Sequence, residues 1–107
     1  MVFSDSMRCE YCARLIYKNV SGKYNLCSIK CKNYFRKNKL NNELEKIILD
    51  NISKGWNEIN ILFSKMNFKD KFEFISAIGR MVYFDKTLKT KTKNELSMRS
   101  LISIVKK

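Results

Sequence analysis

The chain of 107 residues contains no histidine and no proline, and it has only three glycines. Without histidine, the commonest general base of enzymes is missing, and a thiol-rich metal site must be built from cysteine alone. Three glycines leave no glycine-rich loop to hold phosphates, and no serine or cysteine lies in a recognisable nucleophile motif. We therefore predict that the protein is not an enzyme.

Long hydrophobic segments are missing as well. The apolar stretch 59–63, for example, is interrupted by Asn60, and it is far shorter than the roughly 20 residues of a membrane span. The N-terminal segment lacks a basic stretch followed by an apolar one, so we expect no signal peptide. These absences predict a cytoplasmic protein without membrane contact, associated with the nucleoid if the source is bacterial.

All four cysteines lie in the first third of the chain, with two residues between Cys9 and Cys12 and three between Cys27 and Cys31. Two close pairs can bring four thiolates to the corners of a tetrahedron, which is the geometry that Zn²⁺ prefers. A reducing cytosol favours a metal site over disulfides. We predict one structural zinc ion, with a disulfide framework and an iron–sulfur cluster as the alternatives.

Basic residues outnumber acidic ones, and the formal net charge is +12. The excess is uneven: residues 1–40 carry +7 and residues 86–107 carry +6, whereas 41–66 carry −1 and 67–85 are neutral. A zinc ion on four thiolates would lower the total only to about +10. Two basic ends around a neutral middle favour a polyanionic partner over a solubility effect.

The cysteine region is predicted to form a small finger. Two short strands, 14–17 and 23–26, are expected on either side of a turn at 19–22. The second cysteine pair opens a helix at 28–39, with Ser28 or Asn25 as its cap, and the spacing of three places both sulfurs on one helix face. Knuckle, hairpin and helix follow the order of a treble-clef finger.

Residues 40–107 are predicted to form an all-α bundle of about three helices. One helix is expected over 42–66, bent at Gly55, with a break at 53–55 as the alternative. A second helix, capped by Asn67, is expected over 68–84. An exposed basic loop then follows at 85–93. A last helix at 94–105 would begin with a capping box formed by Thr92 and Glu95. The domains are thus a finger at 1–39 and a helical domain at 40–107.

Two aromatic residues of the helical part suggest contact surfaces. Trp56 lies centrally in the apolar stripe of the expected first helix, where it fits a core position or a dimer seam. Phe74 does not fit the stripe of Phe72 and Ile75, so it is expected to leave apolar surface uncovered. A protein partner or homodimer through helices 42–66 and 68–84 is therefore a further expectation.

Basic and amide side chains of the finger and of the loop are candidates for nucleic-acid contact, because lysine and arginine pair with phosphates and arginine and asparagine read base edges. The candidates are Arg14, Lys23, Lys30, Lys32, Asn33, Arg36, Lys37, Lys39, Lys86, Lys89, Lys91 and Lys93.

Residues 26–34, Leu-Cys-Ser-Ile-Lys-Cys-Lys-Asn-Tyr, resemble the FCS-type treble-clef fingers, in which Cys-Ser-x-x-Cys follows an upstream Cys-x2-Cys. MYM-type fingers and the bacterial DNA gyrase inhibitor family are similar. The resemblance covers residues 8–36 and implies that Cys9, Cys12, Cys27 and Cys31 are the zinc ligands. It implies nucleic acid or protein as the partner. Residues 40–107 resemble no such family.

Finger and charge together predict a nucleic-acid-binding zinc-finger protein, with DNA favoured over RNA, that acts as a regulator of transcription or accessory factor. The alternative is a protein-interaction module that binds and inhibits or sequesters a host enzyme.

Overall fold

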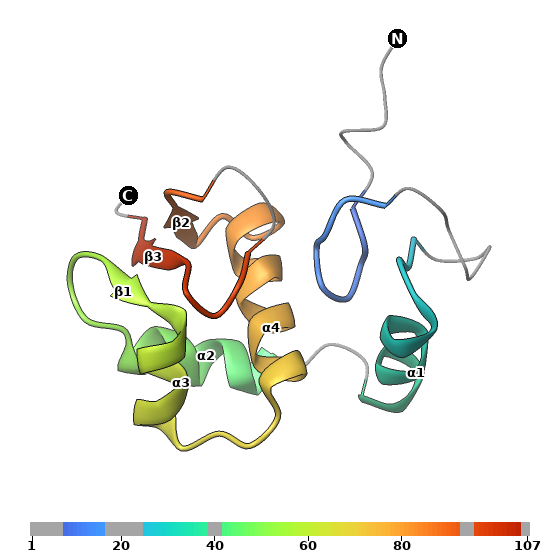
Figure 1. The fold of residues 1–107 in the computed structure, drawn as a ribbon, viewed down its shortest axis with the longest axis horizontal. Coiled ribbons are helices and arrows are strands. Elements are labelled where there is room, and N and C mark those ends of the chain that lie inside the picture. The colour runs from blue at the N-terminus through green and yellow to red at the C-terminus, as the bar shows by residue number, and fades with distance from the viewer. Residues whose placement is uncertain (1–7, 17–24, 39–41, 93–95, 106–107) are drawn as a thin grey trace, which may run out of the picture.

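The computed structural model describes residues 8–16, 25–38, 42–92 and 96–105 (Figure 1). Within these residues the chain forms four helices and a three-stranded antiparallel sheet of order β1-β3-β2, an α+β fold. The elements are α1 (Ile29–Asn38), α2 (Asn42–Asn51), β1 (Asn57–Glu58), α3 (Ile59–Met66), α4 (Lys71–Tyr83), β2 (Leu88–Thr90) and β3 (Leu101–Ile104).

Helix α4 is the central element, because it packs on two sides. Phe74, Ile78 and Met81 are fully buried in a core shared with α2, α3 and the sheet. Phe72, on another side of the helix, packs against a second core that contains the cysteines. Figure 1 shows α4 between the sheet and the loop of the first cysteine pair. A helix that is apolar on most of its circumference is buried on most of it.

The prediction that Phe74 leaves apolar surface uncovered is wrong, since Phe74 is completely buried. Its ring packs edge-on against Phe63, with the ring centroids 5.1 Å apart. A single buried stripe of apolar side chains was expected on this helix, whereas α4 has two.

The single helix predicted over 42–66 is also wrong, because α2 and α3 are separate and the segment between them leaves the helical path. Gly55 there has a left-handed φ of 85°. The Asn57 side chain accepts a hydrogen bond from the Ser53 N–H (3.2 Å) and donates to the carbonyls of Ser53 (2.8 Å) and Gly55 (3.0 Å). These side-chain bonds replace the helical ones and stabilise the loop.

The prediction of a helix over 94–105, and with it of an all-α domain, is wrong as well. Residues 101–104 form β3, the middle strand of the sheet, which pairs with both β1 and β2. Its β-branched residues Ile102 and Ile104 favour an extended strand. The expected loop at 85–93 likewise contains β2. Glu95 of the expected capping box lies outside the described residues.

Helices α1 and α4 lie where helices were expected. The residues that begin and end the helices differ from the prediction in one case. Asn67, expected to cap the second helix, instead ends α3 in a left-handed conformation. Asp70 caps α4, and its carboxylate accepts the Glu73 N–H at 3.0 Å.

Two predictions lie wholly or partly outside the described residues. The turn at 19–22 and most of the expected hairpin lie there, and so does the domain boundary at 39–40. Among the described residues, a single antiparallel bridge joins Leu15 to Arg8. The part of the chain that the structure describes contains no helix long and apolar enough to cross a membrane.

Candidate metal centre

The first cysteine pair lies on a tight loop that is closed by its own backbone. The Cys9 N–H donates to the Arg14 carbonyl and the Ala13 N–H donates to the Cys9 carbonyl, both at 2.8 Å. The Cys12 N–H points at the Cys9 sulfur, 3.5 Å away. Ala13 has a left-handed φ of 64°, which reverses the chain directly after Cys12. The loop thus holds both sulfurs on its inner side.

The second pair lies at the start of α1. Cys27 precedes the helix and Cys31 lies in its first turn. Ser28 caps this turn, because its Oγ accepts the Cys31 N–H at 3.2 Å. Glu10 and Asn25 join the two pairs: the Glu10 N–H donates to the Asn25 carbonyl (2.7 Å), and the Asn25 N–H donates to the Glu10 carboxylate (2.9 Å).

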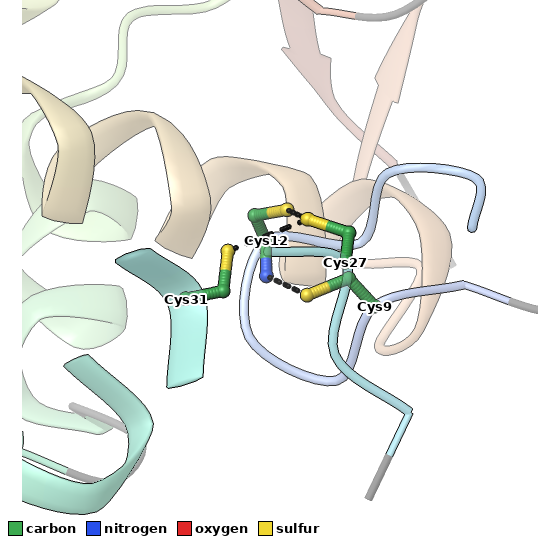
Figure 2. Close-up of side chains that lie close together, drawn as sticks. All are labelled: Cys9, Cys12, Cys27 and Cys31. Atoms are coloured by element: carbon green, nitrogen blue, oxygen red, sulfur yellow. Dashed lines mark hydrogen bonds between the residues drawn. The ribbon is translucent and has the colours of Figure 1, made fainter. Parts of the chain in front are cut away.

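The four sulfurs meet at one point, as Figure 2 shows. All four Sγ atoms lie within 4.8 Å of one another, and the Cys27 sulfur is 3.5 Å from those of both Cys12 and Cys31. A tetrahedron with metal–sulfur bonds of about 2.3 Å has sulfur–sulfur edges of about 3.8 Å. A disulfide would need about 2.05 Å, and all four cysteines are free thiols. The four cysteines can therefore hold a metal ion.

The cluster is largely shielded from water, which strengthens its electrostatics. Cys9, Cys12 and Cys31 are buried and Cys27 is half-buried. Hydrogen bonds from the thiols of Cys12 and Cys31 hold the pKa of Cys9 well below its usual range. Hydrogen bonds with the thiols of Cys31 and, to a smaller extent, Cys9 raise the pKa of Cys12. Four thiols this close share protons, and a bound dication would stabilise them as thiolates instead.

Aromatic rings support the cysteine loop from the side of α4. Tyr11, between the two cysteines of the loop, lies 5.7 Å from the ring of Tyr34 and 5.8 Å from the ring of Phe72. Tyr34 donates its hydroxyl hydrogen to the Asp70 carboxylate at 2.9 Å. Tyr11 thus belongs to the core that contains the cysteines, and Tyr34 packs against it.

Arg80 of α4 reaches the same loop from within the protein. Its side chain is only 3% exposed and donates to the Tyr11 carbonyl through Nη1. Its Nε donates to the Glu45 carboxylate of α2 at 3.3 Å. No motif of the sequence pointed to Arg80. A single charged residue within the run 74–84 was the available signal, since such a charge is buried only when it is paired.

Gly79 of α4 lies directly against the cysteine loop. A Cβ atom at this position would be 2.5 Å from the Cys12 carbonyl oxygen and 3.4 Å from its carbonyl carbon. Real Cβ atoms essentially never approach below 3.0 Å, so the loop backbone would have to move. The absence of a side chain at residue 79 is what allows the helix and the metal ligand loop to pack this closely.

Gly79→Ala should therefore destabilise the protein by about 1–3 kcal/mol, the usual cost of overpacking, and weaken metal binding. Helix propensity alone predicts the opposite sign, a gain of about 1 kcal/mol. Urea unfolding and competition with a metal indicator measure the two effects.

Gly55→Ala is the matched control for this variant. It introduces backbone strain at a φ of 85° but meets no atom within 4 Å, so it should lower stability and leave metal affinity unchanged. A stabilised Gly79→Ala protein with normal metal affinity would contradict the proposed close packing.

The predicted nucleic-acid contacts fall into two groups. Lys30, Asn33 and Arg36 are exposed and lie three residues apart on α1, hence along one helix face. Lys86, Lys89 and Lys91 are exposed on and beside β2. Figure 1 shows α1 and β2 on different sides of α4, so the two groups lie on separate parts of the protein.

The remaining candidates are scattered. Arg14 is exposed beside the cysteine loop, Lys32 is half-buried, and Lys37 lies in the last turns of α1. Lys23, Lys39 and Lys93 lie outside the described residues. The sequence placed Trp56 at a core position or in a dimer seam. The core position is wrong, because Trp56 is 41% exposed beside Lys89 and Lys91.

Comparison with known proteins leaves the site to be interpreted from its own geometry. No protein-family model, no curated protein and no solved structure matches this chain.

Proposed function

We propose that the protein is a zinc-dependent nucleic-acid-binding protein whose finger is of the FCS treble-clef type. The observation that carries the proposal is the exposed basic face of α1, a helix that begins inside the cysteine cluster. A zinc ion bound by Cys9, Cys12, Cys27 and Cys31 would fix the start of this helix and thereby the direction of its side chains. The zinc site is coordinatively closed, so its role is structural.

Contact with phosphates follows from the composition of α1. Its first turn contains no acidic residue, and Lys30, Lys32 and Arg36 carry positive charge along it. Such a helix can lie along the phosphates of a duplex. Arg36 and Asn33 are residue types that read base edges in the major groove, which favours DNA over RNA, whose major groove is narrow. We infer a role as a regulator of transcription or accessory factor.

Binding to labelled duplex DNA across a salt series tests the proposal. Affinity should fall steeply with salt, and Lys32→Glu/Arg36→Glu should weaken binding and reduce the slope of log K against log salt by about 2. Lys46→Glu/Lys69→Glu is the matched control: both side chains are exposed, Lys46 on α2 and Lys69 between α3 and α4, and the change in net charge is the same. Equal weakening by the two pairs, or no binding to duplex at all, would overturn the proposal.

The alternative is a module that binds another protein. Three isoleucines favour it, since Ile29, Ile47 and Ile61 are 64%, 47% and 65% exposed on α1, α2 and α3. A protein complex formed through such residues would depend little on salt, which separates it from DNA binding in the same titration.

A further inference from the structure

The chain contains a single tryptophan, and the fold leaves it exposed at the sheet. Trp56 immediately precedes β1 and is 41% exposed. The ammonium of Lys91 lies 4.7 Å from the centroid of its ring and that of Lys89 lies 5.8 Å away. The fold thus presents a partly exposed indole ring beside two ammonium groups.

The strand register places these residues on the outer face of the sheet. Ile102 of β3 and Leu88 of β2 are buried in the core. Because neighbouring residues of a strand point to opposite faces, the exposed Lys89 and its partner Ser103 lie on the face opposite that core, where Ser103 in the middle strand is itself covered. Continuing the β1–β3 register by one residue brings Trp56 opposite Ser103 in the same row. The outer face thus aligns an aromatic ring and a lysine across β3.

This surface suits one class of ligand. The face of an indole ring stacks on any nucleobase, and ammonium groups beside it can pair with the adjoining phosphates. In a duplex the base faces are covered by their neighbours, so only an unpaired base can offer its face to Trp56. An exposed cation–π contact is weaker than a base–aromatic stack, so a base can displace Lys91 from the ring and leave its ammonium for a phosphate.

Charge around the tryptophan supports an anionic ligand. Among the described residues, Lys89 and Lys91 lie beside the ring of Trp56. One acid, Glu58, points to the same outer face, because its register partner Leu101 alternates with the buried Ile102. Lys89 and Lys91 outnumber this single carboxylate, and the balance on the face remains positive.

We propose that the outer face of the β1-β3-β2 sheet is a binding site for single-stranded nucleic acid, with Trp56 stacking on a base and Lys89 and Lys91 pairing with phosphates. The proposal rests on the proposed function in that the protein contacts nucleic acid, but it assigns a second, separate surface and an unpaired substrate. The α1 face would then contact the duplex and the sheet face a neighbouring single strand.

Because Trp56 is the only tryptophan, its fluorescence reports on this surface alone. The test titrates the full-length, zinc-loaded protein with a short oligothymidine and follows both tryptophan fluorescence and the anisotropy of a labelled copy of the oligonucleotide. We expect quenching that saturates together with the anisotropy. Trp56→Ala should weaken single-strand binding by about 5- to 150-fold, the range for loss of one base stack, and leave duplex binding unchanged.

Three variants keep the test decisive. Trp56→Phe retains a ring and should lose less affinity than Trp56→Ala. Lys89→Gln/Lys91→Gln preserves the ring and should reduce the single-strand salt slope by about 2. Ile61→Ala is the matched control, because it removes an apolar side chain that is 65% exposed on α3 and should change nothing.

The possible results separate this site from the finger. Single-strand binding that neither quenches Trp56 nor weakens in Trp56→Ala would overturn the sheet site, whereas duplex binding that depends on Lys32 and Arg36 would leave the proposed function intact. Single-strand binding that quenches Trp56 and weakens in Trp56→Ala, without any binding to duplex, would support the sheet site and overturn the role of α1. Absence of binding to either oligonucleotide would overturn both.

Discussion

Replacing Cys31 with serine, or removing the metal with a chelator, should abolish the tertiary structure of the described finger residues. Binding of a structural zinc ion contributes about 10–16 kcal/mol in small finger peptides, whereas the whole stability of a domain of this size is about 5–15 kcal/mol. Half of the buried residues of the finger core are the thiols themselves, beside Tyr11, Ile16 and Leu26. So small an apolar core cannot replace the metal.

Elemental analysis and circular dichroism measure this effect. We expect one zinc ion per chain in the native protein and none in Cys31→Ser, together with a loss of helical signal from α1. Zinc without iron would also exclude the iron–sulfur alternative. Ser28→Ala is the control, because it removes the hydrogen bond to the Cys31 N–H but no ligand, and should cost about 1 kcal/mol. A Cys31→Ser protein with native structure would contradict the metal centre.

Arg80→Met should destabilise the protein by about 3–5 kcal/mol, which is the cost of removing one partner from a buried ion pair. The Tyr11 carbonyl would lose its donor, and the Glu45 carboxylate, whose side chain is 15% exposed, would lose its cation. Urea unfolding should show a lower midpoint with an unchanged slope. Arg80→Lys should be intermediate, because lysine lacks the planar fork that reaches two acceptors.

Two further measurements test whether the unpaired carboxylate of Glu45 causes this loss of stability. Burial, and next a hydrogen bond with Asp85, raises the pKa of Glu45, while Arg80 lowers it. A raised carboxyl pKa means that stability is greatest where Glu45 is protonated and is lost as pH rises through that pKa. The deficit of Arg80→Met should thus be larger at a pH above the pKa of Glu45 than at a pH below it, and Glu45→Gln/Arg80→Met should recover part of it. A loss of stability that does not change with pH and is not reduced by Glu45→Gln would contradict the unpaired Glu45 carboxylate as its cause.

Local patterns in the sequence predicted the local features of the structure. The spacing of the cysteines predicted the cluster at which all four sulfurs meet, because each pair is held by a short loop or a single helical turn. Helix α1 followed from the position of Cys27 and Cys31, and α4 from a periodic run of apolar residues. Such signals depend on residues within a few positions of one another.

The break between α2 and α3 was predicted only as the alternative to a bent helix, because the apolar period continues across it. The break arises because Asn57 bonds to a loop backbone in which Gly55 is left-handed. Features that depend on distant residues were missed. Strand β3 exists because β1 and β2 pair with its two edges. The exposure of Trp56 follows from both effects, since a residue between a broken helix and a strand no longer lies on a helical stripe.

The hydrogen bond between Arg80 and the Tyr11 carbonyl joins residues 69 positions apart, and this has a consequence for the order of events during synthesis. All four cysteines leave the ribosome before α4 is made, so a metal ion would first be bound by a cysteine cluster whose loop still lacks Arg80 and the packing of Gly79. That early complex would bind the metal less tightly, because the contacts that close the loop are absent. Tight metal binding would then require the C-terminal half to fold, and an incomplete chain would release its metal more readily.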